Sequence, residues 1–240
     1  MIELIKWLTD EEKKKIYTQE YWNNIELEKT KEFWIENGNY ELCLAHLNKY
    51  LIREYHFSEK FIKNYYKDSI KVADLASGIG WTSTLISKID KVKEVHSVEI
   101  SKHRIGSLYE ECVRMLSGDE NKLFRYWGSF YNLKFENESM DILYLSQAFH
   151  HADAPIKLLI ECERVLKKNG RIILVGEHFI SFKMIIRRFI SNFIKKKTIN
   201  FNFYDLFPAD NILGDHYYRV SDYFFMFNSL GFSLKYEKLN

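Results

Sequence analysis

Prolines and cysteines are scarce in this sequence of 240 residues. The two prolines, Pro155 and Pro208, provide no proline-rich linker that would divide the chain into domains. Cys43, Cys112 and Cys162 are widely spaced, which argues against a disulfide framework and against the paired cysteines of a zinc site. We therefore expect three reduced, buried thiols and no metal site.

Long apolar runs are also absent. No stretch reaches the roughly 18 apolar residues of a membrane-spanning helix, and the N-terminus turns polar within about ten residues, unlike a signal peptide. The sequence also lacks an excess of charge of either sign, because its 35 Lys and Arg residues are balanced by 33 Asp and Glu residues. This balance gives no reason to expect a nucleic-acid partner. We expect a cytoplasmic monomer or homodimer without stable membrane association.

The clearest local signal is the stretch 71–82. An apolar run with an acidic residue predicts a strand, Gly78 and Gly80 predict a turn, and Trp81 begins a helical pattern. A glycine turn before a helix N-terminus lets a ligand approach exposed N–H groups. Glu99 ends the next predicted strand, 21 residues after Gly78, where a carboxylate can accept both ribose hydroxyls. The pattern favours a nucleoside-containing cofactor, with a purely structural turn and a surface glutamate as the alternative.

From residue 71 onward the chain alternates between strand and helix patterns, which predicts a parallel sheet. We divide the sequence into a helical N-terminal cap without strands (1–66), an α/β core (67–178) and a C-terminal lid or substrate segment ending in the last strand of the sheet (179–240). The helical pattern at 182–193 has an apolar face that we expect to pack on the domain or to form a lid wall; a membrane-surface helix is the alternative. The predicted strands cover 71–75, 92–98, 123–127, 140–145, 171–175 and 232–238.

The stretch 74–80, Glu99, the segment 149–151 and the helix-to-strand passage 164–171 together resemble the class I S-adenosylmethionine-dependent methyltransferases. The resemblance covers about residues 70–178, with Ala76 standing where the family usually has its first glycine. It implies a doubly wound, Rossmann-like α/β fold, with a mostly parallel sheet and helices on both faces. A seventh strand, usual in the family, is not expected here.

The resemblance also implies a set of residues for S-adenosylmethionine. The strand end and turn would hold its methionine part, Glu99 its ribose and Ile100 its adenine, with further contacts after the third and fourth strands of the core. Aromatic residues near the N-terminus are candidates to cover it. The predicted cofactor-binding residues are Asp74, Ala76, Ser77, Gly78, Gly80, Glu99, Ile100, Ser129, Phe130, Gln147, Tyr21 and Trp22.

Two histidines follow the fourth strand of the core, His150 and His151. A neutral imidazole is the usual proton acceptor near neutral pH, so we consider both as catalytic candidates and favour His150. The alternative is a pair of hydrogen-bonded loop histidines. His216, Tyr217 and Arg219 are candidate substrate contacts, unless this run simply precedes a helix.

The predicted reaction is methyl transfer from S-adenosylmethionine to an oxygen or nitrogen nucleophile of a small molecule, such as a sugar or a phosphorylated surface-polysaccharide precursor. A nicotinamide-dependent oxidoreductase would share the glycine turn and Glu99, but Ser83 stands where its third glycine belongs. A nucleic-acid methyltransferase is disfavoured, because its Asp/Asn-Pro-Pro-aromatic motif is absent at 146–149. A non-catalytic module that binds the cofactor stays open.

Overall fold

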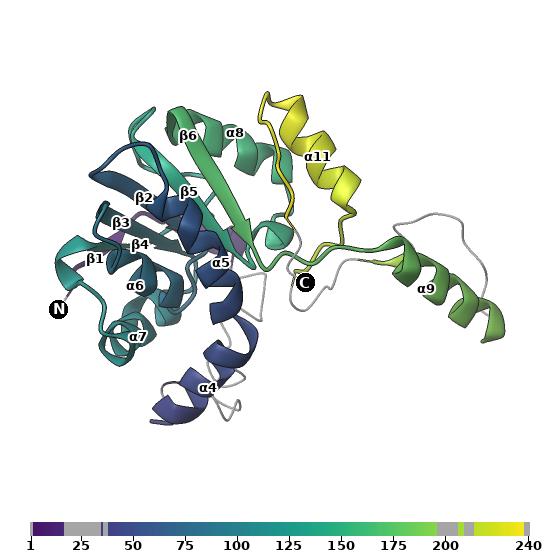
Figure 1. The fold of residues 1–240 in the computed structure, drawn as a ribbon, viewed down its shortest axis with the longest axis horizontal. Helices are drawn as coiled ribbons and strands as arrows, with labels where there is room; N and C mark the ends of the chain where they lie inside the picture. Colours follow the sequence, from purple (N-terminus) through teal and green to yellow (C-terminus); the bar gives the residue numbers. More distant parts are fainter. Residues whose placement is uncertain (1, 17–34, 36–37, 196–205, 209–213, 238–240) are drawn as a thin grey trace.

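A computed structural model describes residues 2–16, 35, 38–195, 206–208 and 214–237. Its ribbon shows a sheet with helices packed around it and one helix, α9, extending to the side (Figure 1). The strands are β1 (Leu4–Lys6), β2 (Ile70–Leu75), β3 (Val92–Glu99), β4 (Leu123–Trp127), β5 (Met140–Ser146) and β6 (Leu166–Val175). The α-helices are α1 (Asp10–Ile16), α4 (Tyr40–Tyr50), α5 (Ile52–Lys63), α6 (Trp81–Ser87), α7 (Tyr109–Leu116), α8 (Pro155–Val165), α9 (Phe182–Ile194) and α11 (Val220–Ser229). Shorter helical turns are η2 (Arg104–Leu108, π), η3 (Glu120–Lys122, 3₁₀) and η4 (Phe149–His151, 3₁₀).

The sheet has six strands in the order β1-β4-β3-β2-β5-β6, and every pair is parallel. The chain builds outward from β2 through β3 to β4, and then crosses to the other side of β2 for β5 and β6. This confirms the predicted doubly wound fold. The order reverses between β2 and β5, and open α/β sheets bind ligands in the crevice at the carboxyl ends of such strands.

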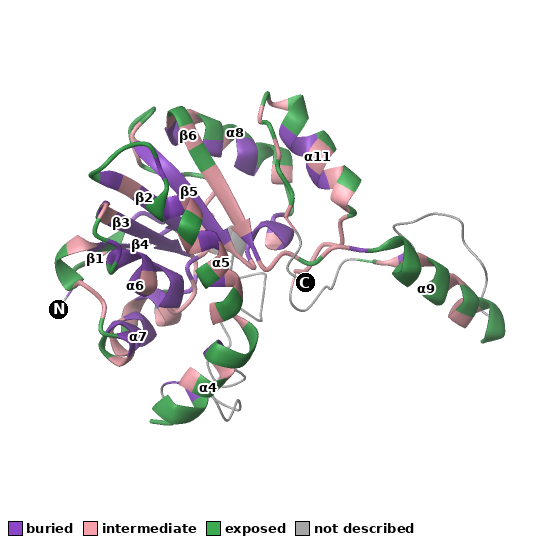
Figure 2. Ribbon diagram, viewed as in Figure 1, coloured by how far each residue is buried: buried purple, intermediate pink, exposed green. Residues whose placement is uncertain are grey.

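Alternate residues of each central strand point to opposite faces, and each face has its own apolar core. On one face, Val72 and Tyr144 pack with residues of α4, α5, α6 and α7. On the other, Ala73 and Leu145 pack with residues of α8 and α11. Figure 2 shows the resulting layering, with the strands mostly buried between exposed outer helix surfaces. Burial on both faces explains the near-continuous apolar strands of the sequence.

The N-terminal segment contains a strand that the sequence pattern does not predict. β1 pairs in parallel with β4, with Leu4 opposite Arg125, and thereby forms an edge of the sheet. The buried Arg125 helps to hold it there, because its Nε donates to Ile2 O at 2.8 Å. The expectation that residues 1–66 contain no strand is therefore wrong. A three-residue edge strand is too short to show an alternating pattern.

The C-terminal part departs from prediction as well. Residues 232–237 form no strand in the part of the chain that the structure describes, so the expected last strand at 232–238 is wrong for those residues. β6 in turn begins at Leu166 instead of Arg171. Met140 lies opposite Leu166 and Ile142 opposite Arg171, so the residues between Leu166 and Arg171 form an irregularity within β6.

α9 lies away from the sheet (Figure 1), and none of its residues is buried. Its apolar side chains Phe182, Ile190 and Phe193 are exposed, so the predicted packing of this helix on the domain is not found. The excursion that carries α9 is closed at its base, where Phe179 bridges Tyr218 and Ile180 N–H donates to Tyr218 O at 3.0 Å. Among the described residues, no helix is long and apolar enough to cross a membrane.

Candidate active site

The turn between β2 and α6 forms one wall of a cavity of about 600 Å³. Ala76 and Gly78 both have left-handed backbones, with φ of 55° and 57°, and both line the cavity together with Ser77. A Cβ placed on Gly78 would meet no atom within 4 Å. The backbone at Gly78 therefore faces open space that a ligand can occupy.

Gly80 has a different task. Its φ is 78°, and a Cβ at this position would lie 2.2 Å from the Tyr109 ring. Gly80 does not line the cavity. The absence of a side chain at Gly80 lets α6 begin in close contact with α7. Gly80 is therefore needed for packing and not for ligand contact.

Glu99 is fixed by backbone donors on both sides. Its Oε2 accepts the N–H of Gly78 at 2.8 Å, and its Oε1 accepts the N–H of Ser101 at 2.8 Å. The residue is buried but lines the cavity. Each carboxylate oxygen has a second lone pair, so the group can still accept hydrogen bonds from a diol in the cavity. This geometry fits the ribose of a nucleoside cofactor.

Asp74 supports the site from behind. It is fully buried on β2, where the strand order reverses. It accepts hydrogen bonds from Thr82 Oγ1 at 2.5 Å and Ser83 Oγ at 2.6 Å. Burial raises its pKa from 3.8 to about 6, although the two hydroxyl groups oppose that rise. Asp74 does not line the cavity, so it holds the first turn of α6 against β2.

The remaining cavity walls come from the carboxyl ends of β3, β4 and β5 and from the N-terminal region. Gln147 has φ of 51° and donates its N–H to Val175 O at 2.8 Å, which turns the chain sharply after β5. Of the predicted cofactor residues, the structure brings together Ala76, Ser77, Gly78, Glu99, Ile100, Ser129, Phe130 and Gln147. Tyr21 and Trp22 lie outside the described residues.

Several wall residues are missed by the sequence analysis. α4 contributes Cys43 and Leu47, and nothing in the sequence pattern of this helix indicates that it closes a cavity. Arg104 and Lys157 bring cations to the wall, and no motif marks either of them. The further unpredicted wall residues include Glu12, Ile35, His46, Leu51, Tyr131, Asn132, Asp153 and Gly214.

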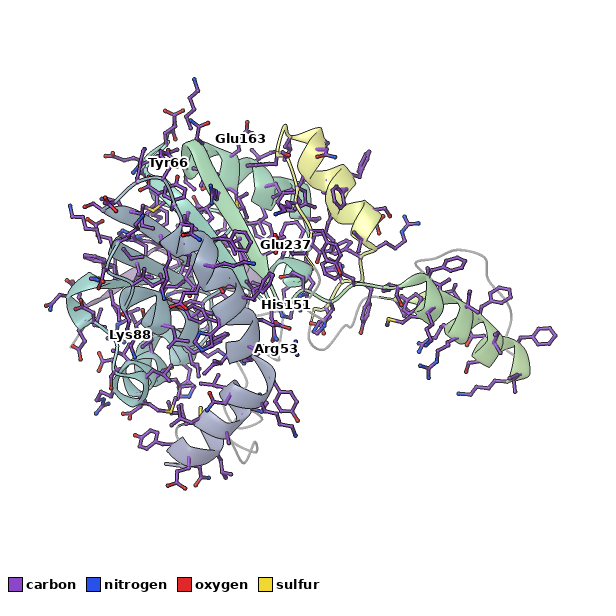
Figure 3. All side chains as sticks on the ribbon, viewed as in Figure 1. Arg53, Tyr66, Lys88, His151, Glu163 and Glu237 are labelled. Atoms are coloured by element: carbon purple, nitrogen blue, oxygen red, sulfur yellow. The ribbon has the colours of Figure 1, made fainter. Side chains whose placement is uncertain are left out.

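The two histidines of η4 have different surroundings. His151 lines the cavity, whereas the His150 side chain is 3 % exposed and does not. Figure 3 shows His151 at the carboxyl edge of the sheet, near the tip of β6. Burial, and next the charge of His150, lower the pKa of His151 to about 4, so its ring is neutral at neutral pH.

A buried carboxylate, Glu177, organises the histidine turn. Its Oε1 accepts the N–H groups of Ala148 and Phe149, both at 3.0 Å. Its Oε2 accepts from His150 N, His150 Nδ1 and Tyr223 OH at 3.1, 2.9 and 3.0 Å. Burial by itself would raise the pKa of Glu177, but its hydrogen bond to His150 and the charge of that ring lower it. The sequence gives no sign of this role, because Glu177 follows β6 and the turn follows β5.

The predicted substrate residues lie beside the cavity and do not line it. His216 contacts Asp153, with Nε2 to Oδ1 at 3.0 Å, and its N–H donates to His150 O at 2.8 Å. Arg219 holds the first turn of α11 through Asp222, with Nη2 to Oδ1 at 2.7 Å. Tyr217 lies near Phe207, with ring centroids 6.3 Å apart. Of the residues described between 206 and 219, Gly214 is the one on the cavity wall.

Residues 73–174 match the family model of the methyltransferase domain. The match and the fold agree with the resemblance seen in the sequence, so residues 73–174 are similar to the methyltransferase domain and the sheet has the fold of class I methyltransferases. Proteins of this class use S-adenosylmethionine as the methyl donor.

Two curated proteins and a solved structure are similar to the chain. It is 30 % identical over 125 residues to an uncharacterised methyltransferase, YcgJ, of Bacillus subtilis strain 168, over 51 % of this chain and 46 % of that protein. It is 29 % identical over 103 residues to a sarcosine/dimethylglycine N-methyltransferase of Aphanothece halophytica, over 42 % of this chain and 35 % of that protein. The crystal structure of Bacillus subtilis YcgJ has the same fold, with a TM-score of 0.54 and 22 % identity over 72 % of this chain and 67 % of that one. The alignments to the two curated relatives thus span less than half of either protein.

Proposed function

We propose that this protein transfers a methyl group from S-adenosylmethionine to an oxygen or nitrogen nucleophile of a small molecule. The observation that carries the proposal is the Glu99 carboxylate, held at 2.8 Å by the N–H groups of Gly78 and Ser101 at the wall of the cavity. When bound, the cofactor supplies an electrophilic methyl group on its sulfonium. The nucleophile–carbon bond would form as the sulfur–carbon bond breaks, the sulfur would keep the electron pair, and the proton of the nucleophile would pass to solvent.

The residues of the chain bind and orient the two reactants and exclude water between them. Glu99 accepts the ribose hydroxyls, and the backbone of Ala76 and Gly78 lies against the methionine part. Ile100 and Phe130 pack beside the adenine, and Gln147 lies toward the reacting methyl group. The positions of these residues on the cavity wall support these proposed roles.

The acceptor lies on the side of the cavity formed by His151 and the residues near it. Because His150 does not line the cavity, we propose that His151 holds the nucleophile and that His150 acts through it. Their ring centroids are 4.2 Å apart. The catalytic role predicted for His150 therefore moves by one residue in this proposal. His216 and Tyr217 would then position this wall without touching the acceptor.

The size of the cavity supports a small acceptor. A volume of about 600 Å³ lies within the range of small-molecule sites, about 300–1,000 Å³, and it has to hold the cofactor and the acceptor together. The relative from Aphanothece halophytica is named for N-methylation of sarcosine and dimethylglycine. Small amines are therefore tested beside the sugars and phosphorylated sugars that the sequence analysis suggests.

Two measurements test the proposal. Isothermal titration compares S-adenosylhomocysteine, S-adenosylmethionine and NADH, and we expect only the first two to bind tightly. Radiolabelled S-adenosylmethionine is then incubated with a panel of small amines, sugars and sugar phosphates, and labelled product is expected from one class. Tighter binding of NADH would overturn the cofactor assignment. Binding without turnover of any panel member would favour a non-catalytic module.

A further inference from the structure

Three potential metal ligands meet beside the cavity. His150 and His151 come from η4, and Asp215 comes from the segment that returns from the α9 excursion before α11. One ligand atom from each residue lies within 4.8 Å of the other two. The two segments are joined by the backbone, because His216 N–H donates to His150 O at 2.8 Å. The cluster is thus held by main-chain contacts as well as by its side chains.

A neighbouring carboxylate favours one tautomer of the neutral His150 ring. Its Nδ1 lies 2.9 Å from Glu177 Oε2, and both side chains are almost fully buried, at 3 % and 2 % exposed. A proton on Nδ1 leaves the lone pair on Nε2, which lies 3.9 Å from Asp215 Oδ1. A histidine that donates its other N–H to a carboxylate is the arrangement that orients metal-binding imidazoles in proteins.

The contacts of Asp215 support a shared ligand. Its Oδ1 is buried and accepts no hydrogen bond among the described residues, although His151 Nδ1 lies 3.0 Å away. A buried carboxylate oxygen without a donor is costly. Ligand atoms bound to one cation at about 2.0–2.2 Å come to lie roughly 3 Å apart. A cation between these atoms would satisfy the lone pair that the protein leaves open.

We propose that His150 Nε2, His151 Nδ1 and Asp215 Oδ1 bind a divalent transition-metal ion, with its remaining coordination positions open. Two imidazoles and one carboxylate suit zinc, cobalt, iron and manganese better than magnesium, which prefers an all-oxygen set. This site contradicts the expectation of no metal, which considered only the spacing of the cysteines. The ligand Asp215 is 64 residues from His151 in the sequence, so no local motif indicates the site.

The position of the site suggests what the ion does. Because His151 lines the cavity, an ion bound to it lies at the wall where the acceptor is placed. An open coordination position can take the hydroxyl or amine of the acceptor and ease the loss of its proton. This part of the inference rests on the proposed methyl transfer, whereas the binding of the ion does not.

Metal binding is tested directly on the full chain. The protein is treated with a chelator, dialysed, and titrated with Co²⁺ and then with Zn²⁺, with calorimetry and the visible absorption of Co²⁺ as readouts. We expect one equivalent to bind, with Co²⁺ absorption that Zn²⁺ removes, and no comparable binding of Mg²⁺. Asp215→Asn keeps the shape of the side chain and His151→Ala removes a ligand; each is expected to weaken Co²⁺ binding at least tenfold.

Two further variants complete the design. Glu177→Gln disturbs the orientation of His150 and is expected to weaken Co²⁺ binding about 10- to 100-fold. His56→Gln is the matched control, because His56 also lies near a carboxylate, with Nδ1 3.6 Å from Glu59, but belongs to the exposed surface of α5. Circular dichroism confirms that each variant is folded.

The outcomes separate this inference from the proposed function. Absence of stoichiometric Co²⁺ binding, or equal binding by wild type, Asp215→Asn and His151→Ala, would overturn the metal site. A plain hydrogen-bonded cluster of His150, His151 and Asp215 would give that result. S-adenosylhomocysteine binding is measured on the same samples. If Co²⁺ binds but S-adenosylhomocysteine does not, the metal site stands and the methyl-transfer proposal fails.

Discussion

His150 Nδ1 lies 2.9 Å from Glu177 Oε2, and this buried pair joins the turn after β5 to the end of β6. Glu177 accepts five hydrogen bonds in all, three of them from backbone N–H groups of that turn. Its carboxylate therefore fixes the position of both histidines relative to the cavity.

Replacing Glu177 by glutamine tests this relationship. An amide group has one acceptor oxygen in place of two, so several buried donors lose their partner at about 1–3 kcal/mol each. We expect Glu177→Gln to lower the free energy of unfolding by at least about 2 kcal/mol, measured by urea denaturation. The exposed Glu163 on α8 provides the control, and Glu163→Gln is expected to be neutral. Equal stability of the two variants would show that the turn does not depend on Glu177.

Glu99→Gln tests the cofactor contact while keeping the size of the side chain. Loss of a charge-assisted contact to the ribose is worth about 1.5–3 kcal/mol, so we expect about ten- to a hundredfold weaker binding of S-adenosylhomocysteine in calorimetry. Glu94 lies on the same strand but pairs with Lys71, with Oε2 to Nζ at 2.8 Å, so Glu94→Gln is the control. Unchanged affinity in Glu99→Gln would place the ribose elsewhere.

The two glycines of the turn are expected to respond differently to alanine. Gly80→Ala combines a left-handed backbone with a clash against the Tyr109 ring, so we expect it to cost at least about 3 kcal/mol of stability. In Gly78→Ala the new methyl group meets no neighbouring atom. The expected loss of stability is then only that of a left-handed backbone at a non-glycine residue, about 1–2 kcal/mol. The new methyl group enters the ligand space, so S-adenosylhomocysteine should bind at least tenfold more weakly. Thermal unfolding and calorimetry on both variants decide this, and the reverse order of stabilities would contradict it.

Asp74 is expected to make stability depend on pH. Its pKa rises from 3.8 in the unfolded chain to about 6 in the folded protein because of burial. The folded protein therefore binds the Asp74 proton more tightly than the unfolded chain does. The stability that this proton contributes is lost as pH rises from about 4 to about 6. A difference of about two pH units corresponds to about 3 kcal/mol.

The Asp74→Asn variant isolates this effect. The free energy of unfolding is measured for both proteins at pH 4, 5, 6 and 7. Because only the wild type loses stability as the pH rises, the variant minus wild-type difference should increase by about 3 kcal/mol from pH 4 to pH 7. Parallel curves for the two proteins would mean that Asp74 keeps an ordinary pKa.

The segments 1–66 and 179–219 are proposed as two sides of a lid. α4 already contributes Cys43 and Leu47 to the cavity wall, and Gly214 contributes to it from the segment before α11. If both segments close over the reactants, limited proteolysis within them should slow when S-adenosylhomocysteine and an acceptor bind together. As a reference, the rate of proteolysis within the α/β core is measured in urea, which destabilises the core enough for cleavage to occur. Identical cleavage with and without ligands would argue against closure.

The sequence allows prediction of the nucleotide half of the site much better than the acceptor half. Gly78, Glu99 and Gln147 each end or follow a strand of a parallel sheet, and such positions meet at one edge by the rules of the fold. The contact of Asp215 with His151 depends instead on how a long excursion returns to the sheet, and the contact of Glu177 with His150 on which strands are neighbours. β1 is too short for a periodic signal, and the exposed helix α9 shows that an amphipathic pattern does not identify what its apolar face meets.

The closure of the α9 excursion at Phe179 and Tyr218 has a consequence for how such a protein diversifies. The free energy of closing a loop rises only by about 0.6 kcal/mol for each doubling of its length. Insertions, deletions or exchange of the segment between these residues should therefore change the stability of the sheet little, provided that the returning segment with Asp215 and His216 is kept. Recombination between relatives at this point would keep the described cavity wall, including His151 and Gly214, and chimeras joined at 179 and 214 would test whether the exchanged segment changes acceptor preference.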